Sequence, residues 1–396
     1  MAAQKQKVLY ICNALDESTK GIRSITSDSY AATNKVFGLI AAMRKADLRC
    51  QVLSLGRGRQ NWSGKIHNAT VCRIRGHSIY YCCFIHVPFF THFITSISAT
   101  YLIIRLIARD PNLSVLVYNR SYHYILAISV ARLLKVRVYL DLEDGDETKN
   151  QNYFYFVRSF TMRVLYNWLC PAGALISNSN LRNEISHPSP LVCYGAVEKV
   201  NLNSKDWQKP CIRILFGGTL LKEVGCLLLL DAIDILRLRS PLLFNKLHFV
   251  VTGKGEHAKI FREYSIRSSD WLTMHEDLAY DDYIDILQTC HIGLSLRLSK
   301  FEMSKTTFPS KVIEYAHNGL LILTSRMDDI TILFGHKVLY LEEESPLALA
   351  NLLESIPMRR AELQRIANLG SKQIMENCSL EVVGNNINKL LNENFI

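Results

Sequence analysis

The sequence predicts a two-domain α/β protein in which each domain is a doubly wound parallel sheet with helices on both faces. Three observations lead to this fold class. The chain has 396 residues, more than a single hydrophobic core usually serves. Short apolar runs alternate with helical patterns, as they do in parallel sheets whose strands are joined by helices. A polar stretch at 201–210 interrupts this alternation and is expected to be a linker.

The first half of the chain predicts an N-terminal domain over residues 1–200. Its apolar runs, which favour strands, lie at 8–12, 50–55, 114–118, 136–142 and 173–177. Its helical patterns lie at 30–45, 94–109, 124–134 and 155–169.

The second half predicts a C-terminal domain over residues 210–378. Strands are expected at 212–216, 247–252, 271–274, 292–296 and 320–324. Helices are expected at 225–238, 258–265, 280–288 and 311–317. The last helical pattern, 380–391, predicts a crossover helix over 379–396 that returns to the first domain. Because ligands bind at the carboxyl ends of strands in such sheets, we expect a cleft between two facing domains.

Composition narrows the class of protein. Hydrophobic residues make up 48% of the chain and charged residues 21%, which is typical of a globular protein. The net charge of +10 predicts attraction to polyanions: nucleic acid, an anionic membrane face or phosphorylated substrates. A nucleic-acid-binding protein is the non-enzymatic alternative, but the Lys and Arg residues are dispersed and no nucleic-acid motif is present, so no nucleic-acid partner is expected.

Cysteine usage and the N-terminus point to the cytoplasm. The 11 cysteines include no Cys-x-x-Cys pair, so neither a zinc site nor a disulfide framework is expected. The first residues lead directly into the apolar run 8–12, without the features of a signal peptide. These features predict a protein that is not secreted.

Residues 76–104 contain no Asp, Glu, Lys or Arg and are rich in aromatic side chains. The segment is long enough to span a bilayer. Its histidines, Pro88 and several Ser and Thr residues argue against a span. We expect a helix pair whose aromatic side lies on the membrane surface, with burial against the domain core as the alternative.

The segment 307–320 predicts a loop that leads into a short helix. Pro309 fits the first helical turn and Gly319 fits the position just past the last turn. The apolar run 320–323 that follows fits a buried strand. The helix therefore lies within an α/β unit, a common setting for nucleotide binding.

Polar side chains at the front of this helix suit a nucleotide diphosphate. Free N–H groups at a helix start attract anions, and Ser310 and Lys311 add a donor and a positive charge. Glu314, one turn further on, can accept hydrogen bonds from sugar hydroxyls. The alternative is an ordinary capped helix with solvated polar residues.

Two glycine turns are expected at the same edge of the second sheet. Gly218, Thr219 and Lys222 follow the strand 212–216, and Gly253 follows the strand 247–252. Glycine lets the backbone approach a ligand closely. Lysines at this edge would offset the charge of a diphosphate leaving group.

Two arginines stand at other predicted strand ends. Arg297 follows the strand 292–296, and Arg120 follows the strand 114–118. Either is a candidate for phosphate contact, and an ordinary surface arginine is the alternative.

With these motifs, the second half resembles the donor-binding domain of a GT-B glycosyltransferase, similar to the retaining family 4 group. The resemblance rests on residues 217–222, 253–256 and 280–296, and on Pro-Ser-Lys-x-x-Glu-Tyr at 309–315 followed by Asn-Gly at 318–319. It implies two Rossmann-like domains.

The resemblance also implies roles for particular residues. Glu314 would bind the donor ribose, and Ser310, Lys311 and Lys222 the diphosphate. Gly218 and Thr219 would lie over the phosphates. The chain departs from the family at Thr306, where a glutamate that faces the donor sugar is common.

An acidic loop follows the strand 136–142 in the first half. Similar enzymes carry a polar catalytic-site residue there, which makes Asp144 the first candidate and Glu143 the second. A retaining enzyme needs no base on the opposite face, so the role would be to position an acceptor hydroxyl or to stabilise positive charge. A solvated acidic turn is the alternative. Asp144 and Asp146 also form an Asp-x-Asp pattern that would hold a divalent ion in a metal-dependent transferase, ranked below the metal-free mechanism.

These expectations describe a cytoplasmic glycosyltransferase on the inner face of a membrane. It would move a sugar from a nucleotide diphosphate donor, UDP-linked, to a lipid-linked or cell-surface polysaccharide, with retention, without metal and without a cofactor. The enzymatic alternative is a nucleotide-sugar epimerase of similar architecture, which would turn over the donor without an acceptor.

Overall fold

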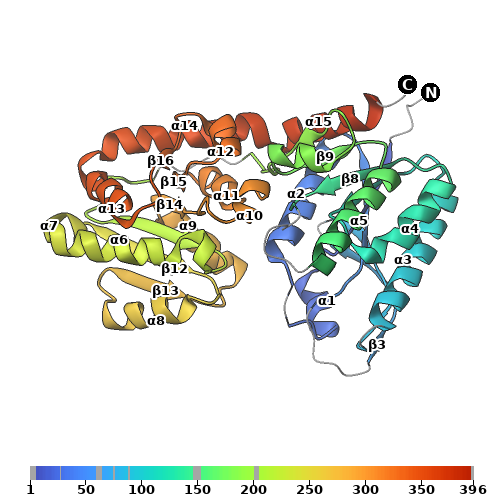
Figure 1. Ribbon diagram of the computed structural model, residues 1–396, viewed down its shortest axis with the longest axis horizontal. Coiled ribbons are helices and arrows are strands. Elements are labelled where there is room, and N and C mark those ends of the chain that lie inside the picture. Colours follow the sequence, from blue (N-terminus) through green and yellow to red (C-terminus); the bar gives the residue numbers. More distant parts are fainter. Residues whose placement is uncertain are drawn as a thin grey trace. The chain divides into compact units, whose positions relative to one another are not determined.

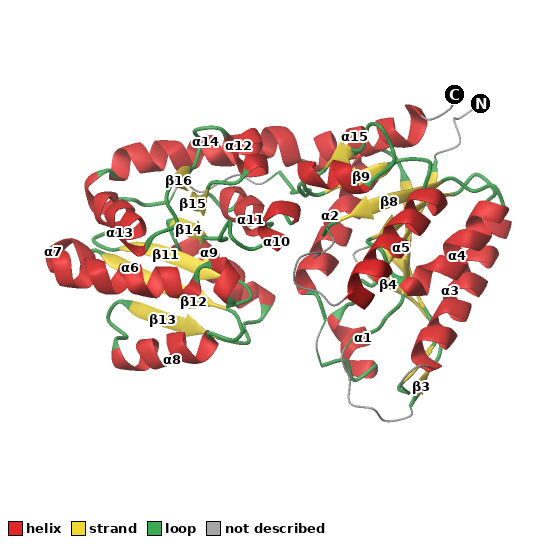
Figure 2. Ribbon diagram, viewed as in Figure 1, coloured by secondary structure: helices red, strands yellow, loops and turns green. Residues whose placement is uncertain are grey.

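The computed structural model describes residues 6–26, 28–58, 65–74, 76–87, 90–145, 153–199 and 205–393. The chain divides into two compact units: unit 1 comprises residues 1–196 and 378–396, and unit 2 comprises residues 197–377. Each unit is built around its own sheet with helices on both faces (Figures 1 and 2).

The sheet of unit 1 has the strand order β10-β9-β8-β7-β1-β2-β5-β4. The strands are β1 (Lys7–Cys12), β2 (Arg49–Ser54), β4 (Thr70–Ile74), β5 (His77–Tyr81), β7 (Ser114–Tyr118), β8 (Val138–Leu142), β9 (Ala174–Ile176) and β10 (Leu191–Val192). Neighbours pair in parallel except β4 with β5. The strand β1 lies inside the sheet, and its residues from Val8 onward are buried, which explains their unbroken apolar sequence.

Two layers of helices cover this sheet. The helices α3 (Phe90–Arg109), α4 (Tyr122–Leu133) and α5 (Tyr153–Leu169) share one core cluster with the strands. On the opposite face lie α2 (Tyr30–Lys45) and α15 (Leu380–Glu393). A Cβ at Gly384 of α15 would clash with the carbonyl of Ala42, so glycine permits this close contact between helices. The expected return of the C-terminal helix to the first domain is confirmed.

Small elements complete unit 1. They are α1 (Glu17–Ile22), the 3-10 helix η1 (Ser179–Glu184), and a separate antiparallel pair of strands, β3 (Ile66–His67) and β6 (Phe84–Ile85).

The prediction of a helix pair over residues 76–104 is wrong for its first half. Residues His77–Tyr81 form β5, which is hydrogen-bonded between β2 and β4. The β-branched and aromatic side chains of this run fit a strand whose alternate residues are buried. Only the second half is helical, as part of α3.

The sheet of unit 2 is parallel throughout, with the order β13-β12-β11-β14-β15-β16. The strands are β11 (Ile212–Gly217), β12 (Leu247–Thr252), β13 (Leu272–His275), β14 (Ile292–Ser295), β15 (Leu321–Ser325) and β16 (Leu339–Leu341). The helices are η2 (Lys222–Val224), α6 (Cys226–Arg239), α7 (Pro241–Phe244), α8 (Ala258–Arg267), α9 (Tyr280–Thr289), α10 (Met303–Thr306), α11 (Lys311–His317), α12 (Asp328–Phe334), α13 (Pro346–Ser355), η3 (Ile356–Met358) and α14 (Arg360–Cys378).

The helix α11 is seated closely on this sheet. The ring of Tyr315 is fully buried against Gly293 of β14, where a Cβ would clash with the ring. This packing fixes which side of α11 is buried and which side remains open at the strand ends.

Candidate functional site

Two glycine turns stack on each other at the carboxyl ends of β11 and β12. Gly218 has φ +123° and Gly253 has φ +126°, conformations that L side chains rarely adopt. A Cβ at Gly253 would clash with the carbonyl oxygen of Gly218. The Gly218 N–H donates to the carbonyl of Thr252 at 3.0 Å. The two turns therefore meet backbone to backbone and present little side-chain bulk.

The helix α11 begins and ends as its sequence predicts. The N–H of Val312 donates to the carbonyl of Pro309 at 3.0 Å, so the first turn begins at the proline. Gly319 has φ +76° directly after the helix. Ser310 is exposed, and its side chain makes no capping hydrogen bond to the helix. Its hydroxyl is therefore not used to cap α11.

Lys311 and Glu314 form a triangle with Tyr283 of α9. The Lys311 ammonium donates to Glu314 Oε2 and to the Tyr283 hydroxyl, each at 2.8 Å. The Tyr283 hydroxyl donates to Glu314 Oε2 at 2.8 Å. Burial, and then the charges of Tyr315 and Glu314, raise the pKa of Tyr283 well above its usual range, so its hydroxyl stays protonated as a donor.

This triangle lies beside the first glycine turn. A Cβ on Gly218 would be 3.9 Å from Cε of Lys311, so the lysine side chain passes next to the turn. The structure thus brings together Gly218, Gly253, Lys311 and Glu314, four residues singled out in the sequence. It adds Tyr283, which sequence reasoning missed although the helix that carries it was expected.

Thr219, Lys222 and Arg297 lie on segments next to this edge. Thr219 and Lys222 are exposed, and Arg297 is half-buried. The N–H of Leu298 donates to the carbonyl of Glu223 at 2.8 Å, which joins the Lys222 segment to the segment of Arg297. Both basic residues are therefore carried at the carboxyl edge of the sheet, as their positions after strands predict.

The acidic candidates of unit 1 have different surroundings. Asp144 is exposed just after β8. Glu143 is only 18% exposed and pairs with Lys35, which also lies 3.3 Å from the buried Asp141. Burial raises the pKa of Glu143, although Lys35 opposes the shift. Glu143 is thus part of an internal ion network, whereas Asp144 is open to solvent; Asp146 lies outside the described residues.

Arg120 takes part in a salt bridge. Its guanidinium donates to Glu184 Oε2 at 2.8 Å and to the Glu184 carbonyl at 3.2 Å. These bonds join the end of β7 to η1, a structural role.

A basic cluster, Arg57, His92 and His123, was not found from the sequence because its members come from three separate segments. The guanidinium of Arg57 contacts His123 Nε2, which also lies 2.6 Å from His92 Nδ1. Burial, then Arg57 and His92, lower the pKa of His123 to about 3. Over the described ranges, no carboxylate is paired with these three groups.

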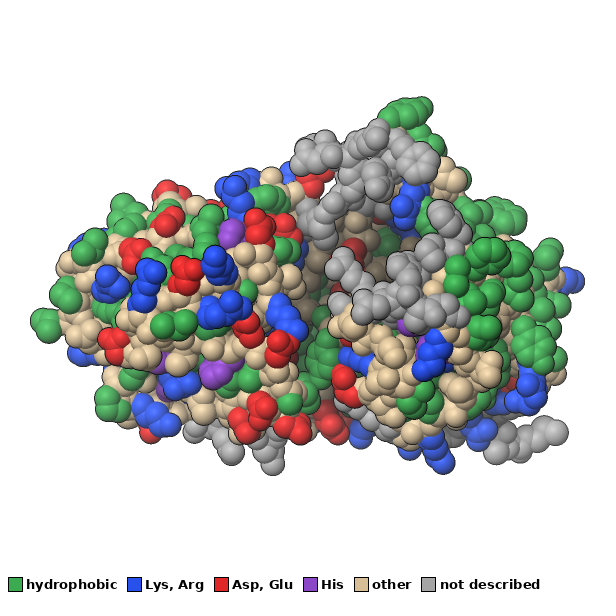
Figure 3. Space-filling model, turned by 90° about the horizontal axis from the view of Figure 1, so that it is seen from below, with side chains coloured by type: hydrophobic (Ala, Val, Ile, Leu, Met, Phe, Trp, Pro, Cys, Tyr) green, Lys and Arg blue, Asp and Glu red, His purple; other side chains and the backbone are tan. Residues whose placement is uncertain are grey.

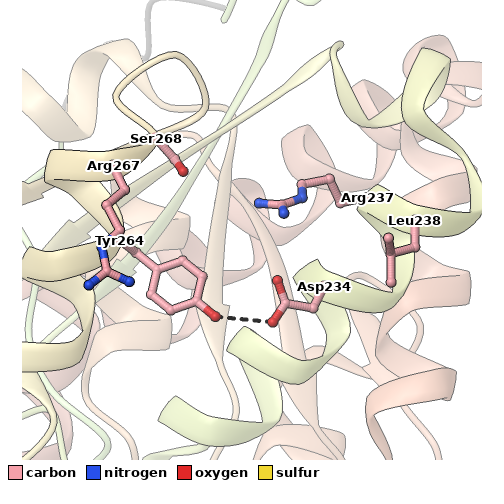
Figure 4. Close-up of a pocket in the computed structure, with 6 residues that line it drawn as sticks. All are labelled: Asp234, Arg237, Leu238, Tyr264, Arg267 and Ser268. Carbon is pink, nitrogen blue, oxygen red and sulfur yellow. Dashed lines mark hydrogen bonds between the residues drawn. The ribbon is translucent and has the colours of Figure 1, made fainter.

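A shallow groove lies elsewhere on unit 2, between α6 and α8 (Figure 4). Arg237 and Arg267 stand on its walls, and the Tyr264 hydroxyl donates to Asp234 at 3.0 Å. The groove is formed by the last turns of both helices, which lie toward the amino ends of the strands. It is therefore separate from the glycine turns. Among the residues that the structure describes, no group of His, Cys, Asp and Glu is arranged to hold a metal ion.

Comparison with protein families gives one match. Residues 236–383 match the family model described as Glycosyl transferase-like. This range contains Lys311, Glu314 and Tyr283 but not the first glycine turn. Comparison with curated proteins gives no match.

Solved structures share the fold along nearly the whole chain. TarM has a TM-score of 0.70 at 8% identity, covering 98% of this chain and 99% of its own. HepE of Anabaena in complex with UDP-glucose has a TM-score of 0.66 at 12% identity, with 98% and 100% covered. A UDP-forming α,α-trehalose-phosphate synthase of Burkholderia xenovorans in complex with glucose-6-phosphate has a TM-score of 0.64 at 14% identity, with 97% and 99% covered.

The fold and the family match define the class of this chain: a glycosyltransferase of the GT-B fold. The predictions of fold class and of glycosyltransferase activity are thereby confirmed.

Proposed function

We propose that the protein transfers a sugar from a UDP-sugar to a lipid-linked or cell-surface polysaccharide, with retention of configuration and without a metal ion. The observation that carries the proposal is the Lys311–Glu314–Tyr283 triangle next to two stacked glycine turns at the carboxyl ends of β11 and β12. The choice of UDP is supported by HepE, which is similar in fold and was solved with UDP and with UDP-glucose.

Each group of this site has a task in the proposed transfer. Glu314 accepts hydrogen bonds from ribose hydroxyls, while Lys311 and Ser310 bind the diphosphate. Gly218 and Gly253 let the phosphates approach the backbone, with Thr219 at the rim. Lys222 and Arg297 add positive charge at the same edge. Charge that develops on the departing UDP is offset by these cations, which lowers the barrier to breaking the bond to the sugar.

Donor binding requires the triangle to rearrange. Without a ligand, the carboxylate of Glu314 is occupied by Lys311 and Tyr283. A diphosphate attracts Lys311, and the ribose takes its place on Glu314. Tyr283 then remains as the donor that orients the carboxylate. The ion pair thus keeps both side chains near their bound positions before the donor arrives.

The acceptor side of the proposal rests on unit 1. Asp144, exposed after β8, is assigned to position the acceptor hydroxyl or to stabilise positive charge at the anomeric carbon. Glu143, held by Lys35, supports the loop from within. The protein is proposed to act in the cytoplasm as a peripheral protein on the inner face of the membrane, where a lipid-linked acceptor would be available.

The test is turnover of a panel of nucleotide sugars by purified protein, with and without chelator, for wild type and Glu314→Ala. We expect one UDP-sugar to be consumed, turnover to survive chelator, and the variant to lose at least about 100-fold in kcat/KM for the donor. The matched control is Glu362→Ala, which breaks an i,i+3 pair with Arg359 on the surface of α14 and leaves the site intact.

Three outcomes would contradict parts of the proposal. Failure to bind any nucleotide sugar would reject the donor site. Loss of turnover with chelator, restored by a divalent ion, would support the metal-dependent alternative. Conversion of the donor to its epimer without an acceptor would identify an epimerase.

A further inference from the structure

Three helices on one face of unit 1 each expose an apolar stripe in addition to the stripe that they bury. On α3, for example, Phe93 and Tyr101 are 66% and 60% exposed, while Ala99 and Ile103 on the same helix are fully buried. We call this surface the α3–α5 face. Its large exposed apolar residues are Phe90, Phe93, Ile97, Tyr101 and Ile104 on α3, Tyr122, Leu126 and Leu133 on α4, and Tyr153, Phe156, Val157, Phe160, Val164 and Trp168 on α5.

These stripes belong to neighbouring helices. The spacing of the exposed residues is three or four along α3 and along most of α5, so each set lies on one side of its helix. The helix α4 packs against both α3 and α5. The guanidinium of Arg158 on α5 lies 4.7 Å from the ring centre of Tyr122 on α4, which joins two of the stripes. Figure 3 shows hydrophobic side chains gathered toward the right-hand side of the molecule, on the part formed by unit 1.

The charges on this face have one sign. The sequences of α3, α4 and α5 contain no Asp or Glu. They contain Arg105 and Arg109 on α3, Arg132 on α4, and Arg158 and Arg163 on α5. A soluble surface ordinarily mixes both signs and avoids large apolar patches. Aromatic side chains with interspersed arginines suit the boundary between lipid headgroups and acyl chains, where the apolar part is buried and the cation meets phosphate.

A membrane span and a dimer interface both account for the face less well than a lipid surface does. The helix α3 is long and apolar enough to cross a membrane. However, Ala99, Ile103 and Leu106 belong to the core of unit 1, so extracting α3 to span a bilayer would open that core. A second copy of the chain, joined through the same face, would place arginines of both copies together without carboxylates from these helices to pair with them.

We infer that the α3–α5 face docks on an anionic lipid bilayer, with its aromatic side chains in the interface and its arginines on lipid phosphates. The inference deepens the proposed function, on which it rests only for the nature of the acceptor: a lipid-linked acceptor would meet unit 1 at this surface. Docking itself requires no catalysis.

The first experiment measures binding of the full chain to vesicles of phosphatidylcholine with and without phosphatidylglycerol, by sedimentation. We expect binding only with the anionic lipid and weaker binding at high salt. Trp168 is 68% exposed on this face, whereas Trp207 and Trp271 are buried, so a blue shift of tryptophan emission with vesicles would report insertion at Trp168. Trp168→Phe should remove that shift and keep the binding.

Variants separate the face from the rest of the surface. The triple substitution Phe93→Ser, Tyr101→Ser, Phe160→Ser is expected to weaken binding at least about tenfold. The matched control, Leu242→Ser, Ile332→Ser, Met358→Ser, removes exposed apolar side chains of unit 2 and should bind as wild type does. Arg158→Gln with Arg163→Gln should weaken binding by about fivefold per arginine on anionic vesicles.

Several results would overturn the inference. They are equal vesicle binding by the triple variant and wild type, no binding to anionic vesicles at all, or a dimer in sedimentation velocity that the triple variant abolishes in the absence of lipid. Donor hydrolysis measured without vesicles should be unchanged in the triple variant. If hydrolysis is absent in wild type but vesicle binding holds, the proposed function fails and the docking surface stands.

Discussion

Lys311 and Glu314, one turn apart on α11, are joined directly at 2.8 Å and also through the hydroxyl of Tyr283. The hydroxyl receives a proton from the ammonium and donates its own to the carboxylate. This makes Tyr283 the residue that determines how the pair is oriented toward the glycine turns. An isolated surface pair of this spacing would contribute little to stability, so the value of the arrangement lies in preorganisation of the site.

Tyr283→Phe tests that role. The ring keeps its place under the Lys311 ammonium, 4.5 Å from the ring centre, while the hydroxyl is lost. We expect UDP binding to weaken by about three- to tenfold, because Glu314 loses a donor that fixes its orientation. Isothermal titration with UDP measures the effect. Tyr264→Phe, which removes a hydroxyl bonded to Asp234 in the groove of unit 2, is the control and should bind UDP normally.

Gly253→Ala should damage both stability and donor binding. The new Cβ would strike the Gly218 carbonyl, and the backbone has a φ value that alanine rarely adopts. We expect a loss of roughly 1–3 kcal/mol in the free energy of unfolding and a clear loss of UDP affinity. Denaturant unfolding and titration measure the two effects. Gly21→Ala, with no atom near its added Cβ, should change neither, and equal behaviour of the two variants would contradict the stacking of the turns.

Lys35→Met should destabilise unit 1. Asp141 is fully buried, and its charge is compensated by Lys35 and by the Tyr10 hydroxyl. Removing one partner of a buried pair typically costs about 3–5 kcal/mol. Denaturant unfolding gives the magnitude. Lys372→Met, which removes an exposed partner of Glu376 on α14, should cost less than about 1 kcal/mol.

Asp144 and Glu143 can be separated by their expected phenotypes. Asp144→Asn should lower kcat with little change in stability, because its side chain is exposed. Glu143→Gln should lower the unfolding free energy, because Lys35 would lose part of its compensation. A full set of kinetic constants, measured beside unfolding curves, distinguishes the two. If both variants lose only stability, the catalytic assignment is wrong.

Acid should destabilise the protein in part through His123. Its pKa is lowered to about 3 by burial, Arg57 and His92, so the folded state keeps it neutral while the unfolded chain protonates it near pH 6.5. Stability from this group is therefore complete above pH 6.5 and decreases as the pH falls toward 3. Between pH 7 and pH 5 we expect His123→Asn to lose roughly 1 kcal/mol less than wild type in unfolding free energy. Parallel pH profiles of the two proteins would contradict this.

Much of the architecture is predictable from the sequence because each sheet is formed by consecutive strand–helix units. The helix at 30–45 and the strand at 114–118 have the predicted bounds. Strand β5 was harder to predict, because an uncharged aromatic run is compatible with either a helix or a strand until its partners β2 and β4 are known.

The site divides in the same way. The glycine turns and the Lys311–Glu314 pair are local in sequence and could be identified from spacing. Tyr283 and the cluster of Arg57, His92 and His123 depend on contacts between distant segments, which no local pattern encodes. The burial of Glu143 depended likewise on Lys35, which lies 108 residues earlier.

The return of α15 to unit 1 has a consequence for the order in which the chain can fold during synthesis. Val383, Ile387 and Leu391 pack into the core beside α2, so unit 1 lacks part of its hydrophobic core until the last residues have been made. Unit 2 is continuous in sequence and can close first, although domains ordinarily fold from the N-terminus onward. A ribosome that stops before residue 380 would leave α2 exposed on a nearly complete chain, a species that is prone to aggregation.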